Sequence, residues 1–258
     1  MDTNILPNSL KKFLSNMDHE FVMIGCTKDI VIRFFNNNGI YYLKTGVINT
    51  EAIREHEMLI WLNGKLPVPD VLDWVEIEDR FYLLTSSANG TMACNEHGLA
   101  KDDEFTAIKA LADGLKQFQE IDISTCQLES KLDNKFKAAL FNIENNLVDM
   151  EDFINNGRFD TPFELYDYLL LNRPDEDLCL THGDFCLPNI FITGDKATGF
   201  VDMGRGGIAD RYQDIALCYR SLKYNTKNQV DKNLLFECLE MKPDWEKIDF
   251  YILLDELF

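Results

Sequence analysis

Three polar residues between positions 184 and 202 have the types and the spacing to hold a metal ion beside a reactive hydroxyl group. Asp184 ends a His-Gly-Asp triplet, Asn189 comes five residues later, and Asp202 follows the second of two short apolar runs. Those runs, 190–192 and 199–201, predict two strands of a hairpin, and antiparallel strands joined by a short turn bring their outer ends together. We therefore expect Asn189 and Asp202 to meet at one end of the hairpin, with Asp184 on the loop just before it.

Phosphoryl transfer requires this set of groups. The reaction needs a carboxylate near the attacking hydroxyl, and it needs oxygen ligands that hold Mg²⁺ against the departing phosphates. The pattern H-x-D-x-x-x-x-N followed by D-x-G supplies both in that order. Each residue taken alone could equally cap a turn or complete a hydrogen bond in the core. Their order around one predicted hairpin favours a metal and phosphate site.

The composition indicates a globular protein that works in the cytoplasm. A chain of 258 residues can bury a substantial core as one large domain or two lobes, and 46% hydrophobic and 27% charged residues suit a soluble protein. The sequence has no apolar run of membrane-spanning length and no long apolar segment at its start, so we expect neither a membrane span nor a signal peptide. Seven scattered cysteines without a CxxC pair suit a reducing compartment and argue against structural zinc.

The net charge of −19 is unevenly distributed along the chain. Residues 1–88 contain 8 Lys and Arg against 12 Asp and Glu, whereas residues 89–258 contain 17 against 32. Such an acidic protein repels nucleic acid and attracts cations. We therefore expect no nucleic-acid partner and interpret the C-terminal part as the region that attracts a cationic molecule, although an ordinary solvated acidic surface has the same composition.

Hydrophobic periodicity predicts strands and two helices up to residue 86, and mainly helices after it. Residues 21–35 read as strand, turn and strand. In the strand 40–44, alternation places Tyr42 and Lys44 on one face. Residues 50–63 have helical spacing with Ile53, Met58, Leu59 and Leu62 on the buried side, and two further strands are expected at 71–77 and 81–86. Other helices are expected at 8–17, 102–120, 130–147, 162–172, 210–222 and 244–258.

Several segments together resemble one family of enzymes. They are YYLK, WLNGKLPVP, THGDFCLPNIF, GFVDMGRGGIADRYQDIA and KPDWEKIDFYILLDELF, and they extend over nearly the whole chain. The sequence resembles the aminoglycoside phosphotransferases, which are relatives of the eukaryotic protein kinases, and it is most similar to the 3′-phosphotransferases. The resemblance implies an α+β, bilobal, protein-kinase-like fold. Residues 1–88 would form an N-terminal nucleotide-binding lobe with a small antiparallel sheet, and 89–258 a mainly helical catalytic and aminoglycoside-binding lobe.

The resemblance also implies how the nucleotide is held. Lys44 would grip the α- and β-phosphates, Glu55 would hold Lys44 in place, and Tyr42 would stack on adenine. Thr27 lies in the turn that would cover the phosphates, and the backbone at Ser86 and Ala88 would read the adenine edge. Because Thr85 is smaller than the side chain often found at its position, we expect ATP but keep GTP open.

The remaining roles that the resemblance implies concern the metal ion and the substrate that accepts the phosphate. Asn189 and Asp202 would hold Mg²⁺, and Asp184 would orient and deprotonate the acceptor hydroxyl. The ammonium groups of an aminoglycoside would bind Asp255, Glu256, the terminal carboxylate of Phe258 and, within the acidic stretch 149–152, Glu151. We interpret Arg205 and Arg220 as ion-pair partners of nearby carboxylates rather than as substrate ligands.

The expected activity is ATP-dependent phosphorylation of an aminoglycoside hydroxyl, the 3′-hydroxyl by resemblance, which would confer resistance. Only 11 residues separate Asp202 from Asp214, which leaves no room for the activation segment of a protein kinase and indicates constitutive activity on a small molecule. Two alternatives stay open: a kinase of the same fold for another cationic or hydroxylated metabolite, such as choline, a fructosamine or a macrolide, and a nucleotide-binding protein without turnover. The sequence leaves the oligomeric state open.

Overall fold

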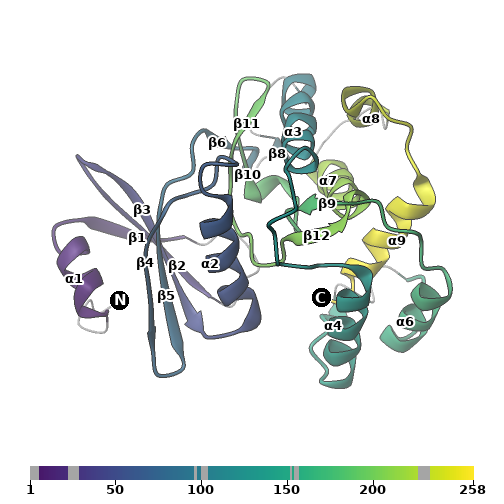
Figure 1. Cartoon of the computed structure of the whole chain (residues 1–258), viewed down its shortest axis with the longest axis horizontal. Coiled ribbons are helices and arrows are strands. Elements are labelled where there is room, and N and C mark those ends of the chain that lie inside the picture. The colour runs from purple at the N-terminus through teal and green to yellow at the C-terminus, as the bar shows by residue number, and fades with distance from the viewer. Residues whose placement is uncertain are drawn as a thin grey trace.

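The computed structural model describes residues 6–22, 29–95, 98–99, 104–151, 153, 157–225 and 233–258. They form two lobes, a five-stranded sheet with two helices and a larger, mainly helical part (Figure 1). The α+β architecture expected from the sequence is confirmed. Thr27, expected over the nucleotide phosphates, lies outside the described residues. Within the described ranges, no helix has both the length and the apolar character needed to cross a membrane.

The N-terminal sheet is antiparallel throughout, with strand order β1-β2-β3-β5-β4. Its strands are β1 (Asp18–Val22), β2 (Ile30–Asn36), β3 (Gly39–Val47), β4 (Val71–Ile77) and β5 (Arg80–Ser86). Asn36 pairs with Gly39 across a tight hairpin turn between β2 and β3, and the Asn36 side chain accepts a hydrogen bond from the Asn38 amide at 2.8 Å. Short turns of this kind fix the register of the strands that follow.

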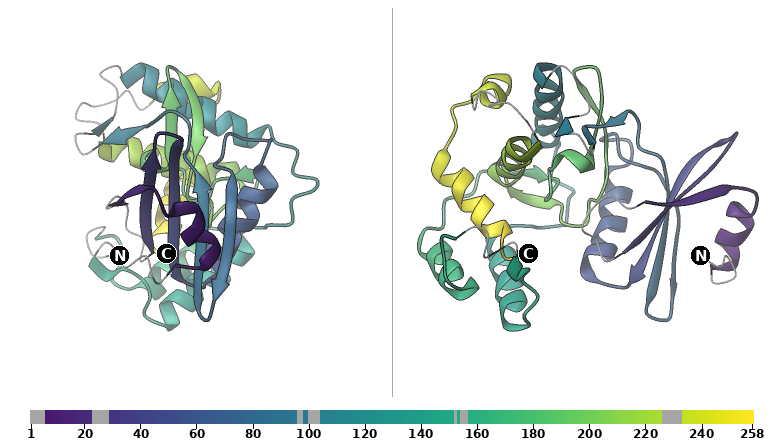
Figure 2. Two further views of the ribbon diagram at one scale, coloured as in Figure 1. Left: turned by 90° about the vertical axis from the view of Figure 1, so that its left-hand side faces the viewer. Right: turned by 180° about the vertical axis from the view of Figure 1, so that it is seen from behind.

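Helices α1 (Asn8–Leu14) and α2 (Thr50–Leu62) lie on opposite sides of this sheet (Figures 1 and 2). Leu43 of β3 packs in a cluster with Leu10 of α1. Because side chains alternate along a strand, Tyr42 and Lys44 face the other side, which is the side of α2 and of the second lobe.

Helix α2 begins and ends as its sequence predicts. Asn49 caps it by accepting a hydrogen bond from the Ala52 amide at 2.9 Å, and Gly64, two residues past its end, adopts a positive φ of 74°. The prediction that Ile53 is buried was wrong, because its side chain is 39% exposed. The inner face of the helix runs instead through Ala52 and Glu55, so a charged residue occupies a position that hydrophobic spacing alone assigns to an apolar one.

The second lobe consists of six helices of the described chain, a 3₁₀ turn and short strands. The helices are α3 (Glu104–Gln119), α4 (Leu132–Glu144), α6 (Pro162–Leu171), α7 (Arg211–Asn225), α8 (Leu234–Leu239) and α9 (Trp245–Asp255), and the 3₁₀ turn is Leu187–Asn189. The strands are β6 (Thr91–Met92), β7 (Cys94–Asn95), β8 (Gly98–Leu99), β9 (Leu178–Thr181), β10 (Ile190–Thr193), β11 (Lys196–Phe200) and β12 (Gly207–Asp210). The predicted lobe boundary after residue 88 falls between β5 and β6.

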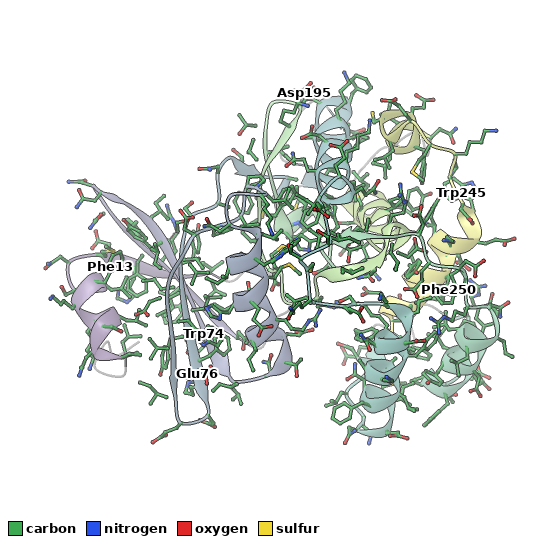
Figure 3. The ribbon with its side chains drawn as sticks, in the orientation of Figure 1. Phe13, Trp74, Glu76, Asp195, Trp245 and Phe250 are labelled. Carbon is green, nitrogen blue, oxygen red and sulfur yellow. The ribbon has the colours of Figure 1, made fainter. Side chains whose placement is uncertain are left out.

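The predicted elements differ from the observed ones mainly at their ends. The second strand of the hairpin that leads to Asp202 starts at Lys196 rather than 199, so the turn is tighter than expected and has Asp195 at the outer end of the hairpin (Figure 3). Asp113 of α3 fixes that end, since its carboxylate accepts hydrogen bonds from Lys196 Nζ at 2.7 Å and from the Ala197 amide at 3.2 Å. This contact from a distant helix extends the strand beyond its apolar run.

A single apolar core joins the two lobes. Leu59 of α2 and Phe81 of β5 belong to the same buried cluster as Leu115 and Phe118 of α3. A backbone hydrogen bond of 3.1 Å from Phe200 to Pro67 adds a direct link between the connector after α2 and the strand that leads to Asp202. The side chains that approach the cleft from the two lobes are therefore carried by one packed body.

Candidate active site

The loop from His182 to Asp184 is fixed by the buried side chain of Asp214. The Asp214 carboxylate accepts hydrogen bonds from the His182 amide at 2.6 Å and from the Gly183 amide at 2.9 Å. Burial raises the pKa of Asp214 to about 7 against the opposing effect of these two bonds. Gly183 has a φ of 87°, and a Cβ there would come within 2.1 Å of the Arg205 carbonyl oxygen, so only glycine fits the loop.

Asn189 joins this loop to the hairpin. Its Nδ2 donates to Asp184 Oδ2 at 2.9 Å and to the Asp184 carbonyl at 3.1 Å. Its backbone carbonyl accepts from the Val201 amide at 3.0 Å, directly beside Asp202. The hairpin therefore brings Asn189 to the same end as the start of the loop 201–206, called the Asp202 loop below, as expected. Asp184 lies against both. Because Nδ2 is directed to Asp184, the amide oxygen is the group left for a metal ion.

Lys44 crosses from the first lobe to the second. Its Nζ donates to Glu55 Oε2 at 2.8 Å and to Asp202 Oδ1 at 2.9 Å. The side chains of Lys44 and Glu55 are 17% and 8% exposed, whereas that of Asp202 is 45% exposed. Burial alone lowers the pKa of Lys44, but the two carboxylates outweigh it and raise the pKa above its usual value. The ammonium group therefore stays charged between the two carboxylates.

Asp202 adopts a left-handed backbone conformation, with a φ of 61°. A residue with a side chain in this region is strained by about 1–3 kcal/mol, and such strain is concentrated at functional sites. Burial raises the pKa of the Asp202 carboxyl, but Lys44, His182 and Arg205 together outweigh it and lower the pKa below its usual value. The strained backbone thus holds an ionised carboxylate beside Lys44.

A cleft of about 460 Å³ opens between the lobes, and seven of the predicted site residues line it. They are Tyr42, Lys44, Glu55, Ser86, Ala88, Asn189 and Asp202. Asp184 is not part of this lining and borders it through its hydrogen bonds with Asn189. Phe191, which also lines the cleft, was not foreseen; its side chain is half-buried between the fully buried Ile190 and Ile192 of β10. Strand alternation was the signal that could have found it.

The donor atoms at the inner end of the cleft fit Mg²⁺. One carboxylate, Asp202, and one amide oxygen, Asn189, are hard oxygen ligands, and Mg²⁺ is usually held by one or two carboxylates together with substrate phosphates rather than by a complete protein cage. In keeping with this, the described residues contain no cluster of three or more His, Cys, Asp or Glu side chains suited to a metal ion.

The C-terminal acidic residues are paired with two arginines. Asp255 accepts hydrogen bonds from Arg205 Nη2 at 2.8 Å and from Arg220 Nη2 at 2.5 Å, and Arg220 Nη1 lies 3.9 Å from Glu256 Oε1. The interpretation of both arginines as ion-pair partners is confirmed. The guanidinium group of Arg205 also lies 5.2 Å from the centre of the Phe258 ring. Glu151, by contrast, is exposed, and no contact within the described chain joins its carboxylate to this group.

Lys135 of α4 was not foreseen in this region. Its Nζ lies 5.0 Å from the centre of the Phe258 ring, on the side of a small cavity that Gly183 and Asp255 also line. Burial and the positive charge of Arg205 lower the pKa of Lys135 to about 8, although Asp255 opposes this. The periodicity of α4 gave no signal for this position, because only the tertiary structure brings α4 to the C-terminal residues, where Asn142 Nδ2 donates to the Leu257 carbonyl at 2.9 Å.

Replacing Lys135 by methionine is expected to stabilise the protein at neutral pH. Below pH 8 the lysine is charged in both the folded and the unfolded state, so the folded state bears the full cost of burying the charge; that cost disappears as the pH rises from 8 to 10.5. We expect Lys135→Met to raise the free energy of unfolding by on the order of 1 kcal/mol at pH 7. The advantage should vanish near pH 10 in thermal unfolding curves.

Lys137→Met, at an exposed position of the same helix, is the matched control and should show no such pH-dependent difference. A stability difference between Lys135→Met and the unmodified protein that stays constant from pH 7 to 10 would show that burial of the charge is not its cause.

A cleft between two lobes, roofed by the Lys44–Glu55 pair, lined by Asn189 and Asp202 and bordered by Asp184, defines a kinase-like phosphotransferase. The model of the Phosphotransferase enzyme family matches residues 48–251, so the chain belongs to that family. It is 41% identical to an aminoglycoside 3′-phosphotransferase of Enterococcus faecalis over 80% of this chain and 78% of that protein. A second aminoglycoside 3′-phosphotransferase, from Acinetobacter baumannii, is 31% identical over 98% of this chain and 99% of its own length.

Solved structures confirm the kinase-like fold. An aminoglycoside 3′-phosphotransferase of type VIII superposes with a TM-score of 0.85 at 25% identity, covering 97% of both chains. An aminoglycoside phosphotransferase from Streptomyces rimosus, solved in complex with ADP and streptomycin, shares the fold with a TM-score of 0.79 at 24% identity over 96% of this chain and 95% of its own.

Proposed function

We propose that this enzyme transfers the γ-phosphate of ATP to the 3′-hydroxyl of an aminoglycoside and thereby confers resistance to the antibiotic. The single observation that carries the proposal is the contact of Lys44 with Asp202, because it joins the phosphate-binding lysine of one lobe to the metal-binding carboxylate of the other across one cleft. The 3′ position is supported by the named activity of the relatives. We place the reaction in the cytoplasm, where ATP is supplied.

Some of the cleft residues would bind the nucleotide and others the metal ion. Tyr42, which lines the cleft, would stack on the adenine, the backbone at Ser86 and Ala88 would read the adenine edge, and Lys44, held by Glu55, would bind the phosphates. The complex of a structural neighbour with ADP supports nucleotide binding in this fold. ATP is the expected donor, and GTP is its alternative because Thr85 lines the cleft with a small side chain.

Asp184 acts on the acceptor. One of its carboxylate oxygens is engaged by Asn189, which leaves the other to accept the proton of the attacking hydroxyl. As the hydroxyl oxygen bonds to the γ-phosphorus, the bond from that phosphorus to the bridging β-γ oxygen breaks and ADP leaves. Asn189 and Asp202 would hold Mg²⁺, which neutralises charge on the phosphates when bound. The remaining contribution is positioning, since the loose transition state needs little covalent help from the protein.

The acidic lobe recognises the polycation. Glu256 and the terminal carboxylate of Phe258 lie beside Asp255, close to the loop that carries Asp184, and we propose that ammonium groups of the drug bind there. Arg205 and Arg220 hold Asp255 in place and neutralise part of its charge. Glu151 is proposed as an outer carboxylate for the same substrate, and the charge of the whole lobe attracts the drug from solution.

The test is the identity of the product. Incubation with kanamycin, ATP and Mg²⁺ should give a phosphomonoester whose phosphorus couples to the proton on the 3′ carbon in a ¹H–³¹P NMR spectrum. A 3′-deoxy aminoglycoside should bind but give no such product, and choline should not be turned over. Saturable turnover of choline alone would identify a metabolite kinase instead, and phosphate found on another carbon would overturn the regiochemistry.

A further inference from the structure

Arg54, the neighbour of Glu55 on helix α2, reaches into the second lobe. A single nitrogen, Nη2, donates to the Gly206 carbonyl at 2.7 Å, to Ser130 Oγ at 3.1 Å and to the Glu129 carbonyl at 3.3 Å. The side chain is half-buried, so these acceptors are partly shielded from water. Figure 1 shows α2 lying between the sheet and the helical lobe, which is the place where such a bridge acts.

One acceptor of Arg54, the Gly206 carbonyl, belongs to the loop that follows Asp202, and the other two belong to the segment just before α4. Ser130 Oγ, which receives one of these bonds, donates in turn to the carbonyls of Arg205 at 3.1 Å and Gly206 at 3.3 Å. The loop also lies so close to α2 that glycine is required. A Cβ on Gly204 would come within 2.8 Å of the Glu51 carbonyl oxygen of that helix, and one on Gly207 within 3.0 Å of Arg54 Nη2.

Two consecutive residues of α2 therefore make the two connections that complete the site. Glu55 holds Lys44 within the first lobe, and Arg54 ties the same helix turn to the loop carrying Asp202 in the second. Lys44 is hydrogen bonded to both carboxylates at once, at 2.8 and 2.9 Å, and this geometry requires α2 and the loop to keep a fixed separation.

From these contacts we infer that Arg54 is a positioning residue for phosphoryl transfer: it locks α2 against the Asp202 loop and so keeps the Lys44–Glu55 pair assembled. This inference rests on the proposed function of the same site. In kinases, the placement of the glutamate-bearing helix decides whether the lysine pair forms. The short stretch of chain between Asp202 and Asp214 leaves no regulated segment that could set the placement of α2. The hydrogen bonds of Arg54 hold α2 in that placement permanently.

The inference predicts a loss on the nucleotide side of the reaction. Arg54→Met keeps the length and apolar stem of the side chain but removes the donor, and it should lower kcat/KM for ATP by about 10- to 100-fold, since small misplacements of catalytic groups have costs of this size. KM for the aminoglycoside should change little. Arg54→Lys, which can still donate to the same carbonyls, should recover part of the loss. Arg80→Met on β5 of the same lobe is the control and should behave as the unmodified protein.

A double-mutant cycle separates positioning from general stabilisation. If Arg54 acts through Glu55, then Arg54→Met should cost much less in a Glu55→Gln background than alone, because the lysine pair is already lost. Additive losses, or a loss of activity in Arg54→Met that is fully accounted for by unfolding of the variant, would overturn the inference. Unchanged kcat/KM for ATP in Arg54→Met would do the same.

Binding of MgADP, measured by calorimetry, distinguishes failure of this inference from failure of the proposed function. If the unmodified protein turns over no aminoglycoside, the proposed function fails, and weaker MgADP binding in Arg54→Met than in Arg80→Met still supports the role of Arg54. Equal MgADP binding by both variants, together with full aminoglycoside turnover by both, leaves the function standing and refutes the bridge.

Discussion

Asp184→Asn should lower kcat for aminoglycoside phosphorylation by about 10²–10⁴-fold, the usual contribution of a positioned general base. Asparagine keeps an oxygen that can accept the hydrogen bond from Asn189 Nδ2, so the loop and the metal ligand should keep their places. What is lost is the ability to take the proton of the attacking hydroxyl. MgADP binding and the thermal midpoint should therefore stay close to those of the unmodified protein, and steady-state kinetics should show the loss in kcat.

The matched control is Asp195→Asn. Asp195 is exposed at the outer end of the β10–β11 hairpin, away from the cleft (Figure 3). Its substitution removes the same charge without affecting the site. Turnover should be unaffected there. If Asp184→Asn retained turnover within a few-fold of the unmodified protein, the role assigned to this carboxylate would be refuted, whatever became of the other site residues.

Lys44→Met is expected to affect both catalysis and folding. Removing one preorganised donor to developing negative charge costs about 10²–10³-fold in kcat, and we expect a loss of that size. In addition, Glu55 would be left buried without its cation, and breaking a buried pair by removing one partner costs about 3–5 kcal/mol. Urea unfolding should therefore show a clear loss of stability in Lys44→Met together with weaker binding of ATP.

The double variant Lys44→Met with Glu55→Leu separates the two effects. Replacing both partners of a buried ion pair by apolar groups is often neutral or stabilising, so stability should return while activity stays low. A double variant as unstable as Lys44→Met would show that the unpaired carboxylate is not the source of the instability. Recovery of activity in the double variant would show that Lys44 serves the fold rather than the phosphates.

Local patterns were sufficient wherever neighbouring residues in the chain decide the geometry. The hairpin at 190–200 places Asn189 next to the start of the Asp202 loop because strand pairing returns the chain to its starting point. The alternation of β3 places Tyr42 and Lys44 on one face. The helical spacing of residues 50–63 likewise places α2 to within one residue. The resemblance of the motifs to a known family then supplied the pairing of Lys44 with Glu55.

Local patterns failed where a contact from a distant element decides. Ile53 has the spacing of a core residue, yet it is exposed because the inner face of α2 is used by Glu55 to reach Lys44. Three glutamates lie close together on this helix, and spacing does not choose among them. The fold does so by turning Glu55 inward, placing Glu51 4.0 Å from Arg205 and leaving Glu57 exposed.

The sequence by itself therefore determined the kinds of groups at this site, the elements that carry them and the family to which they point. Only the tertiary structure decided which charges meet. Lys44 and Asp202 are 158 positions apart, and Arg54 meets Gly206 across 152. The physical reason is that strand and helix patterns depend on neighbours along the chain, whereas ion pairs across a cleft depend on how two packed lobes are held together, which no local pattern encodes.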